Sequence, residues 1–342
     1  SQTGKFYWAL CTYITFTTLY TIIAIPVGSL IPAMTQDRDE RTSLASFRYL
    51  GASSGSISVA VLTLPLVGLF SSPQYGFPIT VAILAFFGAI FAFLCFYHTE
   101  EKYSKTYEKR VSIKDLLRMV FSNFPLHLVI LALLTTWIAN NIKQITVIYF
   151  VKYNLQLEAF FSPILLSVIL QIMFGAFLIN LIKHKFEKKT LFMIGTFLYV
   201  ITDLIIYYIT GYENFWLFAF VASFGFVGFG MAGVMAWSMI ADTVEYGEWK
   251  SGFRAEGTLN AAHVFVFKLS VGFSAWLAGY ILDRTNYKPN AEIQSIDTLN
   301  GLFIMGYIFP AIAGTIAIIV MLFHNYNGAF YEKIFSELKQ RQ

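Results

Sequence analysis

Nine stretches of this chain are almost continuously apolar for twenty residues or more. That length crosses the roughly 30 Å hydrocarbon core of a membrane at about 1.5 Å per residue. Segments such as FPITVAILAFFGAIFAFLCFY, residues 77–97, are apolar all round, whereas the strands of a membrane β-barrel are shorter and alternate. With 57% hydrophobic and 13% charged residues, the chain carries more apolar surface than a water-soluble core buries. The sequence therefore predicts an all-α polytopic membrane protein, with spans at 6–31, 43–69, 77–97, 125–151, 157–182, 190–210, 214–240, 258–282 and 297–324.

The basic residues predict the orientation, because Lys and Arg accumulate in cytoplasmic loops. Assigning alternate loops to one face places 18 of the 24 basic residues on it, and four on the other. We therefore expect a multi-pass protein of the inner (plasma) membrane, embedded in the lipid bilayer, with a cytoplasmic C-terminus. The predicted cytoplasmic segments are 35–48, 98–124, 183–189, 241–257 and 325–342.

The number of spans is odd, so a cytoplasmic C-terminus places the N-terminus outside the cell. The first residue, Ser1, is neither an initiator Met nor preceded by a signal sequence. We expect that an N-terminal portion precedes this chain. The longest polar interruption divides the spans three to six, which is typical of a two-bundle transporter whose second bundle is whole, and its SIKDLLRMV segment indicates an amphipathic surface helix. The predicted units are a partial N-terminal bundle (1–97), a cytoplasmic linker (98–124), a C-terminal bundle (125–325) and a cytoplasmic tail (326–342).

Patterns of enzymatic chemistry are missing from the sequence. It contains no G-x-x-x-x-G-K or H-E-x-x-H pattern, and its five His residues are scattered. Cys11 and Cys95 fall within predicted spans and indicate no disulfide or metal framework. The pI near 8.8 follows from the basic loops and does not indicate nucleic-acid binding. We therefore expect no enzymatic activity, no cofactor and no nucleic-acid partner.

Ionisable residues inside a membrane are costly and are candidates for function. Lys268 lies about ten residues from the cytoplasmic end of its predicted helix, roughly 15 Å deep and beyond easy snorkelling, so we expect it to face a watery cavity. A structural Lys paired with a carbonyl or carboxylate is the alternative. Arg48 stands about five residues into its predicted helix, where snorkelling and ligand binding remain equally open.

Two further ionisable residues lie nearer the external side. Lys143 accompanies Asn140, Asn141 and Gln144, which predicts a polar external vestibule, with snorkelling of the Lys as the alternative. Asp203 is an intramembrane acid that could carry a proton, but it lies within two turns of the external end of its helix.

Other candidates come from spacing and residue type. Small and hydroxylic residues share one face of the first span, which suits either a cavity or tight helix packing. Two prolines, Pro26 and Pro32, should bend this helix. Aromatic rings stack on sugars, so Trp137, Trp237 and Tyr149 are attractive, although the chain has 61 aromatic residues. The residues of the shared face are Tyr13, Thr17, Thr21, Ala24 and Gly28.

The segment ADTVEYGEWKSGFRAEG, residues 241–257, is followed by Lys268 in the next span. It resembles the signature of the glycoside-pentoside-hexuronide:cation symporters, the melibiose-permease branch of the major facilitator superfamily. Residues 4–48 resemble the same family's fourth helix, the following loop and the start of the fifth helix. The resemblance implies a major facilitator fold of which nine of twelve helices, 4 to 12, are present.

Family positions narrow the candidate site. The carboxylate that melibiose-type members carry on helix four falls at Ala24, so the chain is closer to the xyloside-type members. The aromatic residue that melibiose permeases carry on the same helix falls at Gly28, so we do not expect melibiose itself as the substrate. Matching positions imply that Thr21, Arg48 and Lys268 bind substrate, with Thr21 also a candidate ligand of the coupling cation. The other acidic residues with which the family binds its cation and sugar would lie on helices outside this chain. The site of the coupling metal ion or proton is therefore unknown. The full set of candidate substrate-binding residues is Arg48, Lys268, Thr21, Trp237 and Asn141.

The charges of the motif suit a gate, because they would face the first cytoplasmic loop across the two bundles. As exposed pairs they would each contribute about 0 to 1 kcal/mol, which favours a switch with two comparable states. A merely solvated charge run is the alternative. The predicted cytoplasmic gate residues are Asp37, Arg38 and Arg41 from the first loop and Asp242, Glu245, Glu248, Arg254 and Glu256 from the motif.

These readings predict a secondary active transporter. We expect cation-coupled symport, with Na⁺ or H⁺, of a small-molecule sugar or glycoside of the xyloside, pentoside or hexuronide class, by alternating access and as a monomer. Lysolipid:cation symport, found in the same superfamily branch, is the alternative.

Overall fold

The computed structural model of the chain describes residues 2–103, 112–289, 291–326 and 328–340. Residues 104–111 of the predicted linker therefore lie outside the described part. Within that part the chain is helical and has no strand, and nine helical segments are long and apolar enough to cross a membrane. The predicted all-α polytopic fold is confirmed, because each predicted span falls largely on one of these segments.

The helices follow the apolar stretches closely. The first three are α1 (Gln2–Met34), α2 (Arg38–Gly68) and α3 (Pro73–His98), and the amphipathic segment forms the short α4 (Ile113–Ser122). The later helices are α5 (Phe124–Tyr149), α6 (Phe161–Ile182), α7 (Lys188–Ile205), α8 (Phe215–Ser251), α9 (Glu256–Arg284), α10 (Ile296–Phe303), α11 (Phe309–Leu322) and α12 (Gly328–Gln340). Three π-helical turns, Phe150–Asn154, Ile206–Thr210 and Ile304–Ile308, continue α5, α7 and α10, and a 3-10 turn, Glu158–Phe160, precedes α6.

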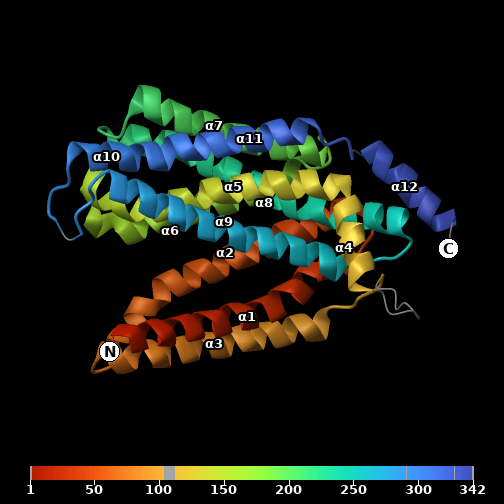
Figure 1. Cartoon of the computed structure of the whole chain (residues 1–342), viewed down its shortest axis with the longest axis horizontal. Coiled ribbons are helices and arrows are strands. Elements are labelled where there is room, and N and C mark those ends of the chain that lie inside the picture. The colour runs from red at the N-terminus through yellow and green to blue at the C-terminus, as the bar shows by residue number, and fades with distance from the viewer. Residues whose placement is uncertain (1, 104–111, 290, 327, 341–342) are drawn as a thin grey trace.

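The helices form two groups that meet at one end (Figure 1). The first group is α1 to α3 and the second is α5 to α11, with α2 packed on α6 and α8, and α1 on α9. Beyond Tyr49 most side chains of α2 are exposed, because α2 slants away from the second group. We call the end where α2 begins, and where α4 and α12 lie, the charged end.

Glycines let α8 approach its neighbours within the second group. A Cβ on Gly175 of α6 would lie 2.0 Å from the carbonyl oxygen of Val227, and one on Gly195 of α7 would lie 2.5 Å from that of Gly228. Small residues at such contacts are a main source of helix association in membranes. Helix α8 therefore packs closely against α6 and α7, and it carries Trp237 together with Asp242, Glu245 and Glu248 of the motif.

Two predicted loops are wrong in part. Helix α8 continues through Ser251, where Gly252 ends it with φ 81°, and α2 already begins at Arg38, capped by the Asp37 side chain. Arg41, Asp242 and Glu245 of these stretches are paired and buried, so the backbone stays helical instead of leaving the bundle. Arg48 consequently lies ten residues after the first residue of α2, about 15 Å along it rather than half that depth.

Candidate functional site

A cavity of about 380 Å³ lies between the two helix groups. Side chains from α1, α2, α5, α6, α8 and α9 line it, and most of them are apolar or aromatic. Sites for small molecules have volumes of about 300 to 1,000 Å³ and combine an apolar lining with a few polar groups. The cavity therefore has the size and composition of a small-ligand site.

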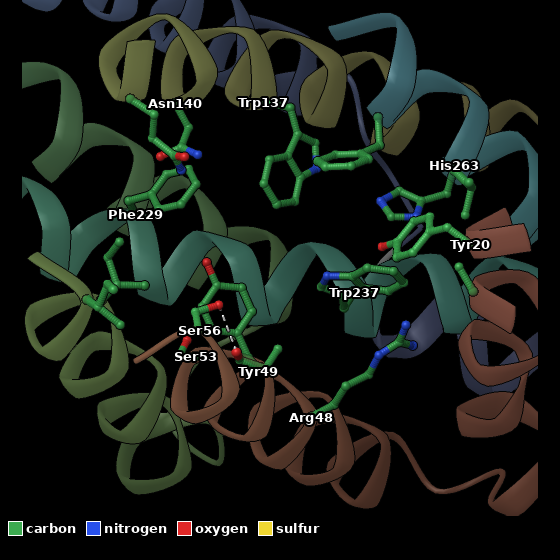
Figure 2. Close-up of a pocket in the computed structure, with 17 residues that line it drawn as sticks. Tyr20, Arg48, Tyr49, Ser53, Ser56, Trp137, Asn140, Phe229, Trp237 and His263 are labelled. Carbon is green, nitrogen blue, oxygen red and sulfur yellow. Dashed lines mark hydrogen bonds between the residues drawn. The ribbon is translucent and has the colours of Figure 1, made fainter. Parts of the chain in front are cut away.

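Arg48, Trp237 and His263 form the most distinctive part of this cavity (Figure 2). The Arg48 guanidinium carbon lies 4.1 Å from the centroid of the Trp237 ring, and the His263 ring centroid lies 4.2 Å from it. Nη1 of Arg48 and both ring nitrogens of His263 are buried, with no hydrogen-bond partner among the described residues. Because a buried donor without a partner is costly, this arrangement favours a ligand with acceptor or anionic groups.

Polar groups also line the cavity further along. Asn140 and Gln144 face it from α5, and Ser53 and Ser56 from α2. The indole nitrogen of Trp137 is buried and has no partner within the described part of the chain. These groups could bind hydroxyls of a ligand whose ring lies against an indole face.

Lys268 and Thr21 lie together but not in the lining of this cavity. The ammonium of Lys268 donates to the Thr21 hydroxyl and, at 3.0 Å, to the carbonyl oxygen of Thr17. Among the family-matched positions, the structure thus brings Lys268 to Thr21 and leaves Arg48 apart from both. Asn141 donates to Ser270 Oγ at 3.1 Å and does not line the cavity, whereas its neighbour Asn140 does.

Helix α1 approaches α9 closely at Gly28. Asn260 donates from Nδ2 to the carbonyl oxygens of Ile25, at 2.8 Å, and Ala24, at 3.3 Å. A Cβ on Gly28 would lie 2.0 Å from this nitrogen, so the position has no room for the aromatic side chain that melibiose-type members carry. Sequence reasoning missed Asn260, because nothing along the chain indicates which side of α9 meets α1.

At the charged end, the predicted gate residues converge on one another. We call Arg38, Arg41, Lys188, Asp242, Glu245, Glu248, Arg254 and Glu256 the charged cluster. It joins α2 of the first group to α7, α8 and α9 of the second. Lys188, the first residue of α7, was not predicted to belong to it, and Asp37 caps α2 instead of pairing with α8.

Arg41 and Glu245 are the centre of the charged cluster. Their side chains form a bidentate pair, with Nη1 to Oε2 at 2.8 Å and Nη2 to Oε1 at 2.5 Å, and Arg41 is 0% exposed. Arg254 reaches Glu245 and Glu248, each at 3.2 Å, and pairs with Glu256. The sequence predicted exposed and individually weak pairs, and this is wrong, since the shared burial makes each charge depend on its partners.

Asp242 extends the cluster to two further helices. Its carboxylate accepts from Lys188 Nζ at 2.7 and 2.9 Å and from Arg38 Nε at 3.3 Å. Arg41 also lies 3.4 Å from it. The carboxylate thereby holds the start of α2 against the start of α7.

Helix α12 covers the cluster through Tyr331. Its hydroxyl donates to the carbonyl oxygen of Gln36 at 3.0 Å and accepts from Arg41 at 3.3 Å. Burial, and next the Glu245 carboxylate, raise the pKa of the Tyr331 hydroxyl above its ordinary value. Burial alone would lower the pKa of Arg254, but Glu245 and Glu256 raise it above the ordinary value, so Arg254 stays charged.

Lys143 and Asp203 form an ion pair inside the second helix group, between α5 and α7. Asp203 is 1% exposed, and the Lys143 side chain is 11% exposed. The sequence predicted a vestibule around Lys143 and left Asp203 isolated, because their pairing depends on how two distant helices are rotated. Elsewhere in the described residues, no group of three or more His, Cys, Asp or Glu side chains has the arrangement of a metal site.

Helices crossing a membrane in two groups, with a ligand-sized cavity between them, define the architecture of a membrane transporter. Residues 1–328 match the family described as MFS/sugar transport protein. The chain therefore belongs to this family of the major facilitator superfamily, which confirms the resemblance to the glycoside-pentoside-hexuronide:cation symporters and the prediction of sugar-type transport rather than catalysis.

Individual relatives agree with this membership. The chain is 31% identical to "Uncharacterized symporter YjmB" of Bacillus subtilis, over 94% of the chain and 70% of the relative. It is 31% identical to "Putative sulfoquinovose importer" of Escherichia coli, over 98% of the chain and 72% of the relative. It is 27% identical to "Isoprimeverose transporter" of Lactiplantibacillus pentosus, over 98% of the chain and 71% of the relative.

Proposed function

We propose that this protein carries a sugar or glycoside bearing an anionic group across the inner membrane, together with a cation, by alternating access. The observation that carries this proposal is the Arg48 guanidinium, which lies over Trp237 in the cavity with a buried donor left unpartnered. A guanidinium matches the two oxygens of a carboxylate or sulfonate, and an indole face suits the apolar face of a sugar ring.

The names of the relatives support both parts of this substrate. One is named for sulfoquinovose, a sulfonated sugar, and another for isoprimeverose. Neither of these names, nor that of YjmB, contains a lipid, so lysolipid transport gains no support from them. The space beside Trp237 would select among sugars of the xyloside, pentoside and hexuronide classes, because the sugar ring has to fit there.

The gating part of the proposal places the charged end in the cytoplasm, since basic residues concentrate there. The charged cluster would then close the cytoplasmic side of the cavity. Opening that side requires α2 to separate from α8, which breaks the bidentate pair of Arg41 and Glu245. Closure and opening would alternate as one helix group rocks against the other.

The coupling cation is Na⁺ or H⁺ in this proposal. Thr21 is the candidate cation ligand within the chain, and its hydroxyl is engaged by Lys268. An ammonium and a coupling cation at the same oxygen would repel each other, so Lys268 would leave Thr21 when a cation binds there.

Uptake by the full chain reconstituted into liposomes tests this function. We expect labelled methyl glucuronide to accumulate under an inward Na⁺ or H⁺ gradient, and to lose most of this uptake in Arg48→Gln. The matched control is Arg118→Gln on α4, an exposed residue that should leave uptake unchanged. Uptake that neither gradient stimulates, or uptake of a labelled lysolipid in place of the glucuronide, would contradict the proposal.

A further inference from the structure

The buried pair of Lys143 and Asp203 has no part in the cavity or the charged cluster described above. One oxygen of Asp203, Oδ1, accepts from the Lys143 ammonium. The other oxygen, Oδ2, is buried and has no hydrogen-bond partner among the described residues, and the same holds for the hydroxyl of Tyr199. A membrane-buried carboxylate with an unpartnered oxygen is a ready acceptor for a proton.

Aromatic rings surround the Lys143 ammonium. Its nitrogen lies 4.5 Å from the ring centroid of Tyr199, 5.0 Å from that of Tyr307 and 5.3 Å from that of Phe226. Cations bind favourably over such rings, most strongly away from water. The ammonium would therefore keep three partners if Asp203 became neutral, so the pair tolerates loss of the carboxylate charge.

The groups around Asp203 come from four elements. Lys143 faces it from α5, Tyr199 from its own helix α7 and Tyr307 from the π-turn Ile304–Ile308, whereas α8 contributes the ring of Phe226. Within the described part of the chain, Lys143 and the two tyrosines are the titratable groups at this site. Lys143 is the charged one among them.

A second, smaller cavity of about 60 Å³ is lined by Lys143 of the buried pair. Lys143 and Tyr307 line it on one side, and Leu155, which follows the π-turn at the end of α5, lines it toward the end opposite the charged end. This volume is large enough for water, and Lys143, Thr146 and Tyr307 bring polar groups to a lining that is otherwise apolar. Phe150 and Tyr307, which line it as well, stand in two of the three π-helical turns, and such turns often mark functional sites.

We propose that Asp203 is the proton-binding site of this transporter, loaded through the small cavity from the end opposite the charged end. The proposal rests on the proposed symport function and makes the proton its coupling ion. A proton from water in the small cavity forms an O–H bond at Oδ2. The net charge of the pair then changes from zero to plus one, and this charge stays on the Lys143 ammonium within its aromatic rings.

The site also contacts the substrate cavity through one layer of side chains. The Tyr199 ring lies 5.8 Å from that of Phe229, and Phe229 lies 6.2 Å from Trp137, and both of these residues line the large cavity. Asn140, which lines it too, precedes Lys143 by one turn of α5. A shift of Tyr199 on protonation of Asp203 would therefore reach the sugar site.

Infrared spectroscopy of the purified chain in lipid tests the proton site without any substrate. We expect lowering the pH to produce the carbonyl stretch of a buried protonated carboxylic acid, and we expect Asp203→Asn to lack this band. Asp283→Asn removes an exposed carboxylate at the same end of the molecule and should retain the band. An unchanged band in Asp203→Asn would overturn the proposal.

Transport measurements then separate this inference from the proposed function. Because one pH unit corresponds to about a factor of ten at equilibrium, a gradient of one unit should drive up to about tenfold accumulation of glucuronide in the wild type. We expect Asp203→Asn to lose this accumulation and to keep exchange of labelled for unlabelled glucuronide within about twofold, with Asp203→Glu retaining accumulation.

Accumulation by Asp203→Asn at the wild-type level would overturn the proton site and leave the transport function standing. Loss of exchange as well as accumulation, in both the Asn and the Glu variants, would assign the pair a structural role and overturn the proposal too. A wild type that exchanges no glucuronide would contradict the proposed function, while the infrared band would still decide the role of Asp203.

Discussion

Replacing Glu245 with glutamine should open the charged end of this protein. The substitution keeps the shape of the side chain and removes one negative charge from the centre of the charged cluster. Arg41, which is 0% exposed, then loses its bidentate partner, and Arg254 loses one of its three carboxylates. The opened state suffers less, because water solvates both guanidinium groups there.

The structure sets the size of this effect. Removing one partner of a buried ion pair costs about 3 to 5 kcal/mol, because the other charge is left uncompensated. We expect the lower end of this range, since Arg41 keeps Asp242 at 3.4 Å and Arg254 keeps Glu248 at 3.2 Å. A cost of about 3 kcal/mol shifts the equilibrium between closed and open states by roughly 100-fold.

Alkylation of a buried reporter measures this equilibrium. Ser238 is 0% exposed, hydrogen-bonded to Thr42 across the seam between α2 and α8, and one turn before Asp242. In a background with Cys11 and Cys95 replaced by serine, a Ser238→Cys reporter should react about 100-fold faster with a water-soluble maleimide when Glu245 is glutamine.

The control for this measurement is Glu332→Gln, the same change at an exposed residue of α12. It should leave the alkylation rate of the reporter unchanged. An equal rate in the Glu245→Gln and parent proteins would refute the reasoning, because it would mean that the buried charges do not hold α2 against α8.

Three further variants test other contacts. Gly28→Ala places a Cβ 2.0 Å from the Asn260 amide nitrogen, so we expect α1 to move from α9 and the melting temperature in detergent to fall by several degrees; an unchanged value would contradict the close approach. Lys268→Ala should weaken glucuronide uptake about tenfold or more, because the ammonium joins α9 to Thr17 and Thr21 of α1 across the two helix groups, and Lys268→Arg should be milder. Wild-type uptake in both variants would show that Lys268 has no role in transport. Tyr331→Phe removes a hydrogen bond worth about 1 kcal/mol, so the Ser238→Cys reporter should react roughly fivefold faster with the maleimide. A rate as high as in Glu245→Gln would contradict this reasoning.

Much of the fold could be predicted from the sequence, because spans in lipid must satisfy their own backbone hydrogen bonds and therefore follow apolar runs. The run 77–97 predicts α3 (Pro73–His98) to within a few residues. The same rule failed where α8 passes Ala241 and continues to Ser251. Buried ion pairs supply there what apolar side chains supply elsewhere, and hydropathy does not register them.

The sequence indicated which residues are candidates for the site, but it did not indicate which of them contact one another. Family resemblance and residue type indicated Arg48 and Trp237, which stack in the cavity, but also Asn141, which faces Ser270 while Asn140 lines the cavity. Which of two neighbouring residues faces a cavity depends on helix rotation, and this rotation is set by packing between distant segments. The pairing of Lys143 with Asp203 was beyond reach for the same reason, as was the depth of Arg48.

Calorimetric titration of the purified protein with two matched sugars tests the central claim most directly. Methyl glucuronide and methyl glucoside share a ring and differ in a carboxylate, for which the unpartnered Arg48 donor is the proposed partner. A hydrogen bond to a charged group contributes about 1.5 to 3 kcal/mol, so the glucuronide should bind about tenfold to 100-fold more tightly, with the difference lost in Arg48→Gln. Equal affinity for the two sugars in the wild type, or a preference that survives in Arg48→Gln, would contradict the account.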